Sequence, residues 1–300
     1  MTTAAASREW TRREERGSLV LLRAIVWLSL KLGRAPVRVL LRGIAAYFFL
    51  FGGRAGSASR EFLARCLGRR PTLAEQYRHF FTFASTVHDR VFLLRDRFEL
   101  FEFEIHGADQ LDERGALLMG SHLGSFEALR AAARLVDRRV AMAMFEENAR
   151  KVNQVLLALA PKLREDIVPL GRLDAMLELQ SRLEDGAFVG VLADRTIDGD
   201  AQGTLPCDFL GAPVGFPLGP MRMAAALRTR VFFMTALYRG GNRYEIRFEP
   251  LADFSDAAAM RGQREARVHD AVREYVAQLE RHARRAPDNW FNFFPFWVDS

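Results

Sequence analysis

A histidine and a glutamate five positions apart, His122 and Glu127, are the residues best suited to acid–base chemistry in this sequence. They lie in the stretch Gly-Ser-His-Leu-Gly-Ser-Phe-Glu, residues 120–127, between an apolar run and an alanine- and leucine-rich run. That order predicts a strand, a tight turn and a helix. Residues five apart on one helix point about 140° away from each other. The two side chains therefore meet only if His122 lies in the turn and Glu127 in the first helical turn.

A carboxylate beside an imidazole fixes its tautomer and stabilises the imidazolium, which makes the histidine a general base. A lone pair of these residue types is more often structural than catalytic. Here small residues on both sides of His122 leave room for a substrate. The predicted helix N-terminus behind them supplies unpaired N–H groups. These features favour the catalytic interpretation, with Glu127 orienting His122.

The stretch resembles the first motif of the lysophospholipid acyltransferase superfamily. It is most similar to that of the bacterial lipid A biosynthesis (lauroyl/myristoyl-type) acyltransferases, which carry His-x4-Glu after a strand. Later stretches resemble further elements of that family in the same order, over about residues 20–297. The Gly-Phe-Pro-x-Gly-Pro and Trp-Phe-Asn-Phe stretches look most like a stand-alone sub-branch, similar to proteins encoded in aryl-polyene and related lipid clusters.

Three of these stretches add expected substrate-binding residues. Val168-Pro-Leu-Gly-Arg172 resembles the second motif, and its arginine could bind a phosphate or carboxylate bidentately or be a surface residue at a helix end. Asp194, after the run Val191-Leu-Ala, resembles the site aspartate of a Pro-Asp-Gln or Pro-Asp-His element. The next cation, Arg195, could meet an anionic headgroup or a carrier phosphate. The stretch 211–220 suits either the wall of an acyl slot or a surface loop, and its expected contacts are Phe216, Pro217 and Gly219.

The resemblance implies acyl transfer from an acyl carrier protein thioester, or from CoA, to a hydroxyl of a membrane glycolipid or related lipid. It implies no metal, no cofactor and no covalent acyl-enzyme. The sequence leaves open an N-acyltransferase that makes an amino-acid lipid, a thioesterase or lipid hydrolase, and a non-catalytic membrane lipid-binding protein. The absence of a Gly-x-Ser-x-Gly elbow counts against a serine hydrolase.

The composition fits a basic protein with an acidic partner. The 300 residues carry a net charge of +6 and include 24 phenylalanines. A basic balance indicates nucleic acid, anionic lipid or an acidic protein as partner. No nucleic-acid module or zinc spacing is present, so we expect a membrane surface and an acidic carrier protein. The cysteines, Cys66 and Cys207, form no CxxC and suit a reducing compartment.

Two apolar runs, residues 19–32 and 37–51, predict an N-terminal membrane-associating segment, residues 1–52. Neither is a clean span of about 20 uncharged residues. Plotted at 100° per residue, the basic residues fall in roughly a 100° sector; these are Arg16, Arg23, Lys31, Arg34, Arg38 and Arg42. We predict a helix, broken near Pro36, that lies in the interface with its cations toward anionic headgroups. Ordinary amphipathic helices packed on the core are the alternative. The resemblance places the protein at the cytoplasmic face of a bacterial inner membrane.

The rest of the chain, residues 53–300, is predicted to be one acyltransferase domain of the α/β class. After a linker at 52–60, a capping box at Thr72 and Glu75 opens a long helix. Strands and helices then alternate, which predicts a central mixed, mostly parallel sheet flanked by helices. The expected strands are about 101–106, 116–120, 139–144, 166–169, 187–193, 231–238 and 244–249, and the expected helices are about 124–136, 148–160, 173–184 and 257–284. Ligands bind at the carboxyl ends of such strands, where His122 falls. The aromatic tail, 289–297, should dock on the domain or enter lipid.

Overall fold

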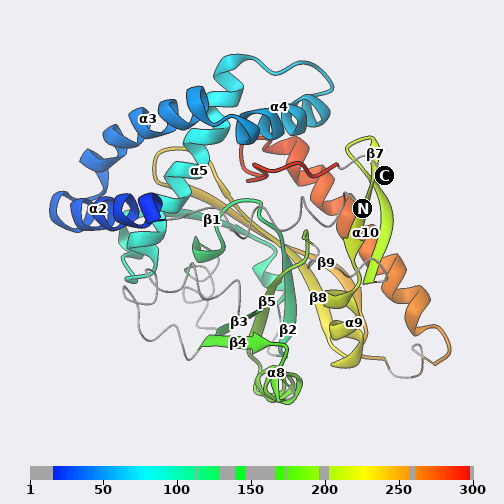
Figure 1. Cartoon of the computed structure of the whole chain (residues 1–300). Coiled ribbons are helices and arrows are strands. Elements are labelled where there is room, and N and C mark those ends of the chain that lie inside the picture. Colours follow the sequence, from blue (N-terminus) through cyan, green and yellow to red (C-terminus); the bar gives the residue numbers. More distant parts are fainter. Residues whose placement is uncertain are drawn as a thin grey trace.

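A seven-stranded sheet in the order β1-β9-β8-β2-β5-β3-β4 forms the centre of the molecule (Figure 1). The structure is a computed structural model that describes residues 16–111, 114–128, 131, 139–145, 166–172, 174–195, 203–256, 258 and 261–297. The strands are β1 (Glu102–His106), β2 (Ala116–Gly120), β3 (Val140–Phe145), β4 (Ile167–Leu170), β5 (Phe188–Leu192), β8 (Arg230–Tyr238) and β9 (Arg243–Asp253). Neighbouring strands pair in parallel, except β8 and β9, which pair antiparallel. The expected mixed, mostly parallel sheet is confirmed.

Helices pack on both faces of the sheet, so its central strand, β2, is apolar throughout. All five residues of β2 are buried. Leu117 and Met119 face one hydrophobic core, and Ala116 and Leu118 face a second. This is the pattern expected of a strand covered on both sides. The helices are α2 (Arg16–Leu32), α3 (Arg34–Phe51), α4 (Arg54–Leu67), α5 (Leu73–Leu93), α8 (Ala175–Glu184), α9 (Gly219–Ala226) and α10 (Arg264–Arg285), with short 3-10 turns at Phe98–Leu100 and Ala108–Gln110.

The expected linker at 52–60 was wrong, because helix α4 already begins at Arg54. The glycine- and serine-rich composition suggested a coil. However, Ala58, Phe62 and Cys66 recur every four residues and are all buried, which is the spacing of a helix face packed on a core. Gly53 separates α4 from α3. The predicted helix at 148–160 and most of the one at 124–136 lie outside the described residues.

The basic sector of α2 and α3 differs from the expectation, because Arg34 and Arg38 point into the protein. Arg34 donates to the buried carboxylate of Asp89 through Nε at 2.7 Å and Nη2 at 2.9 Å. Arg38 and Arg34 each donate to the carbonyl oxygen of Gly241 at 2.6 Å. Tyr244 completes the cluster with a 2.8 Å hydrogen bond to Asp89. A buried carboxylate needs such partners, so these two cations hold α3 on the domain instead of facing headgroups. The side chains of Arg16 and Arg23 lie outside the description.

In the part of the chain that the structure describes, no single helix has the length and apolar character needed to cross a bilayer. Helices α3 and α4 reach that standard only as a pair, with a bend of 92° between them.

Candidate functional site

The carboxyl ends of β2 and β5 bring His122 and Asp194 together. The two strands pair in parallel, with Gly120 opposite Leu192. His122 and Asp194 each follow their strand at the same offset, so the register places them side by side. A hydrogen bond of 3.0 Å from the Ala193 N–H to the carbonyl of Gly120 keeps the two segments paired beyond the strands.

The side chains of His122 and Asp194 form a hydrogen-bonded pair. His122 Nδ1 lies 2.9 Å from Asp194 Oδ1, and the backbone N–H of His122 donates to Asp194 Oδ2 at 3.0 Å. Because an ionised carboxylate only accepts, we assign the proton to Nδ1. The other ring nitrogen, Nε2, then carries a lone pair, and the His122 side chain is 32% exposed whereas that of Asp194 is 1% exposed. This is the arrangement of a general base whose partner is sealed from water.

Asp194 is an anion despite its burial. Burial by itself acts to raise the pKa of this carboxyl group, but the charge and hydrogen bonds of His122 and the charge of Arg195 hold that pKa well below its usual range. The carboxylate is therefore ready to stabilise a positive charge on the imidazole when His122 takes up a proton.

Glu127 does not contact His122 in this structure, so the expected pairing is corrected. Its Oε1 accepts from Arg90 Nε on α5 at 2.6 Å, and its Oε2 accepts a long hydrogen bond of 3.4 Å from Ser125 Oγ. Glu127 lies in the first turn of the helix that begins at Phe126, where it pairs with α5. The structure thus gives the orienting contact to Asp194 and joins Glu127 to Arg90.

The turn that carries His122 requires a glycine at position 124. Gly124 has a φ of 84°, and a Cβ there would lie 2.1 Å from the carbonyl oxygen of Ala236. The next residue, Ser125, donates its N–H to that oxygen at 2.9 Å. The close approach pins the turn against the end of β8, which fixes the backbone of His122.

The aromatic tail, residues 289–297, packs on the turn that carries His122. Of the two expectations for the tail, docking on the domain is the one that the structure shows. Leu123 and Trp290 form an antiparallel bridge. The Phe291 N–H donates to the carbonyl of His122 at 2.9 Å, and Trp290 Nε1 donates to Asp194 Oδ2 at 3.1 Å. Sequence reasoning missed Trp290 as part of the site. Its only signal was the excess of aromatic residues in the tail.

A buried histidine on α5, His79, bonds to the backbone of the aromatic tail. Its Nε2 lies 2.8 Å from the carbonyl oxygen of Trp290, and its Nδ1 lies 2.8 Å from Ser59 Oγ. Because a carbonyl only accepts, Nε2 carries the proton and Nδ1 accepts from the serine hydroxyl. His79 is fully buried, and burial lowers its pKa to about 4.

We expect acid to weaken the fold through His79. The pKa of a histidine in the unfolded chain is about 6.5, whereas burial lowers the pKa of His79 in the folded protein to about 4. The stability that comes from neutral His79 is thus complete above about pH 6.5 and is lost as the pH falls toward 4, by up to about 3 kcal/mol. Chemical denaturation between pH 7.5 and 4.5 should show this slope and a flatter one for His79→Gln. The surface variant His269→Gln is the control, and an unchanged slope in His79→Gln would contradict the assignment.

The structure places Arg172 apart from His122. It follows β4, at the edge of the sheet, three strands from β2, which is about 14 Å by strand spacing. Its guanidinium pairs with Asp174 at 2.6 Å, and both side chains are 59% exposed. Arg195 instead lies beside the site, where it donates to the carbonyl of Phe291 at 3.2 Å and stacks on the ring of Phe294.

The stretch 211–220 forms a hairpin and a helix start, not an irregular path. β6 (Thr204–Phe209) and β7 (Ala212–Pro217) pair antiparallel. Their turn has positive φ at Leu210 and Gly211, as two-residue hairpins require. Phe216 is 1% exposed and packs against Phe209 and Tyr275. Pro217 ends β7 and Gly219 begins α9. Phe216 therefore fills the core.

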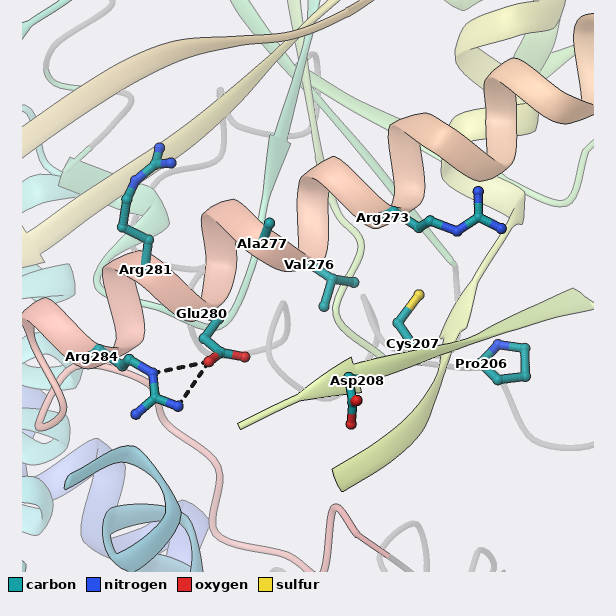
Figure 2. Close-up of a pocket in the computed structure, with 9 residues that line it drawn as sticks. All are labelled: Pro206, Cys207, Asp208, Arg273, Val276, Ala277, Glu280, Arg281 and Arg284. Carbon is teal, nitrogen blue, oxygen red and sulfur yellow. Dashed lines mark hydrogen bonds and ion pairs between the residues drawn. The ribbon is translucent and has the colours of Figure 1, made fainter. Parts of the chain in front are cut away.

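A pocket of about 570 Å³ lies elsewhere, between β6 and α10 (Figure 2). Its lining residues are Pro206, Cys207, Asp208, Arg273, Val276, Ala277, Glu280, Arg281 and Arg284. None of them is a predicted site residue. Its three arginines, Arg273, Arg281 and Arg284, form ion pairs with Asp270, Glu249 and Glu280 respectively. Neighbouring carboxylates therefore balance the positive charge of the lining. Within the described ranges, no group of three or more His, Cys, Asp or Glu side chains is placed to hold a metal ion.

The sequence model of a family described as bacterial lipid A biosynthesis acyltransferase matches residues 6–298. Among solved structures, the chain is similar to the 1-acyl-sn-glycerophosphate acyltransferase PlsC from Thermotoga maritima, with 16% identity, a TM-score of 0.38, and coverage of 82% of this chain and 96% of that one. A search of curated proteins finds no match. The chain belongs to the bacterial lipid A biosynthesis acyltransferase family.

Proposed function

We propose that this protein transfers a fatty acyl chain from an acyl carrier protein thioester to a hydroxyl of a membrane glycolipid or related lipid. His122 acts as the general base and Asp194 as its partner. The observation that carries the proposal is the hydrogen bond between a partly open imidazole and a sealed carboxylate at the carboxyl ends of β2 and β5. The net charge of +6 suits an acidic carrier protein.

The reaction needs one base and no covalent acyl-enzyme. Nε2 of His122 removes the proton of the acceptor hydroxyl as its oxygen attacks the thioester carbonyl. The C–O ester bond forms, the C–S bond breaks, and the imidazolium returns the proton to the leaving thiolate. Asp194 stabilises the imidazolium between these steps. The Glu127–Arg90 ion pair joins the helix that follows the turn to α5.

The acceptor would reach the site from a bilayer that the protein touches with α2 and α3. The outer side of these helices carries large apolar side chains that are exposed. They are Trp27, Leu30, Leu32, Val39, Leu40, Tyr47, Phe48, Leu50 and Phe51, each at least 42% exposed. Lys31 and Arg42 are exposed on the same helices. An apolar face with cations is suited to an interface with anionic lipid. We place this contact at the cytoplasmic face of the inner membrane, where an acyl carrier protein can meet it.

The test supplies membranes with labelled acyl carrier protein and resolves the lipids by mass. We compare the wild type with His122→Ala and with His269→Ala, a control histidine whose side chain is 33% exposed against 32% for His122. One lipid should gain an acyl mass with the wild type and the control, and transfer should fall at least about 100-fold in His122→Ala. Equal transfer by His122→Ala would refute the proposal. Free fatty acid as the product would mean hydrolysis, and an acylated amine would mean N-acylation.

A further inference from the structure

We propose that Trp290 is a positioning residue for the catalytic pair: its indole N–H fixes the carboxylate of Asp194, and so sets the orientation and basicity of His122. The inference rests on the proposed function, in which His122 is the base. It assigns a chemical role to the C-terminal tail, beyond its packing on the core and its backbone contacts with the His122 turn.

The contacts of Asp194 single out Trp290. From the residues that the structure describes, the carboxylate accepts three hydrogen bonds: Oδ1 from His122 Nδ1 at 2.9 Å, and Oδ2 from the His122 N–H at 3.0 Å and from Trp290 Nε1 at 3.1 Å. Two of the three donors therefore belong to His122 itself. Among the described residues, Trp290 supplies the one donor from outside the turn, so it anchors the carboxylate to the rest of the domain.

The side chain of Trp290 is itself fixed by packing and its backbone by a hydrogen bond. It is 1% exposed, and its ring packs against Phe62, Phe209 and Phe296 with centroids 4.8, 5.2 and 4.9 Å away. Its carbonyl bonds to His79 at 2.8 Å. A donor fixed in this way needs no reorganisation when charge develops on the imidazole. Because the ring is enclosed, it does not reach a substrate, and its effect must pass through Asp194.

Loss of the indole N–H should change the pH profile as well as the rate. Without this donor, one hydrogen bond fewer stabilises the negative charge of Asp194. The carboxylate then interacts more strongly with the positive charge of protonated His122 and stabilises that form. The neutral base is then populated only at higher pH. The carboxylate also gains freedom to turn, which weakens the alignment of His122. We expect a fall in kcat of about tenfold, an acid limb of the pH–rate profile shifted upward by about half a unit or more, and an unchanged KM for the acyl donor.

The experiment compares Trp290→Phe with Trp297→Phe in the full-length protein. Trp297 is the matched control, because its indole N–H in the same aromatic cluster bonds to the carbonyl of Phe209 at 3.2 Å. A third protein carries a benzothiophene analogue of tryptophan at position 290, which keeps the shape and removes the N–H. His122→Ala is run alongside, and thermal unfolding is measured for all.

The inference stands if Trp290→Phe and the analogue lower kcat and shift the acid limb while Trp297→Phe does neither. It is overturned if both position-290 proteins keep the wild-type profile, or if Trp297→Phe shows the same shift. Should Trp290→Phe fail to fold, the analogue alone decides. Activity that survives in His122→Ala would instead refute the proposed function, and the inference with it.

Discussion

Replacing Asp194 with asparagine should lower kcat for acyl transfer by about 1,000-fold or more. The neutral amide cannot stabilise an imidazolium. Its oxygen is held by the two donors that Oδ2 of Asp194 now accepts from, the His122 N–H and Trp290 Nε1, so its NH2 group faces His122 Nδ1 and cannot accept a hydrogen bond there. The imidazole then favours the tautomer with its proton on Nε2, which removes the lone pair that faces the substrate. Comparable aspartate-to-asparagine changes behind a catalytic histidine cost up to about 10⁴-fold. Single-turnover transfer of labelled acyl groups measures the step directly.

Glu127→Gln is the matched control, since it makes the same carboxylate-to-amide change at a residue five positions after His122 that does not contact it. Glu127 contacts Arg90 and Ser125, not His122. We expect its loss to lower the rate about tenfold at most, through a less rigid helix start, and to lower the free energy of unfolding by about 1 kcal/mol, given that Arg90 remains 29% exposed. If Glu127→Gln were the more damaging change, the partner of His122 during turnover would be Glu127, as the sequence alone predicted.

Local structure was predictable because its signals are local. The alternation of apolar runs and turns located β2 at 116–120 without error. The capping box at Thr72 and Glu75 is present as predicted and opens α5. Each of these features depends on residues a few positions apart, whose spacing is printed in the sequence.

The contacts of the site depend on strand order, which alternation does not give. Asp194 was expected at the site by resemblance, but its role as the partner of His122 follows from the pairing of Gly120 with Leu192. Glu127 was expected to bond to His122 because the two are near in sequence. A distant cation, Arg90, binds it instead. Trp290 joins through a tail 96 residues beyond Asp194.

The basic sector of the N-terminal helices shows the same limit. Its spacing was correct, yet periodicity cannot tell a sector that faces lipid headgroups from one that faces a buried carboxylate. Arg34, Arg38, Val37 and Leu41 lie on one side of α3 at 100° per residue, and Asp89 lies beneath them. The outward side carries mostly large apolar residues, with Arg42 exposed on the same helix.

That outward side leads to the second large prediction: Leu50→Glu with Phe51→Glu should lower vesicle binding about 100-fold. These side chains are 68% and 72% exposed near the end of α3. Burying each in the interface contributes about 1.5 kcal/mol or more, and together they account for roughly two orders of magnitude in partitioning. The new carboxylates are also repelled by anionic lipid. Co-sedimentation with vesicles containing phosphatidylglycerol measures the change.

Leu177→Glu is the matched control for this membrane face. Leu177 is 71% exposed, but it lies on α8, at the opposite end of the molecule from α3 (Figure 1). It should bind vesicles as the wild type does. Equal losses in both proteins would mean that added charge, and not the α3 face, governs binding.

The same double variant separates membrane contact from chemistry. With an acceptor dissolved in detergent, the protein need not reach a bilayer, so transfer by Leu50→Glu/Phe51→Glu should match the wild type. With the acceptor in vesicles, transfer should fall in step with binding. Asp194→Asn should show the same loss of about 1,000-fold or more in both settings, because it alters the base and not the route to it. If the double variant lost activity in detergent as well, α3 would shape the site itself, and the apolar face would not be a separate docking surface.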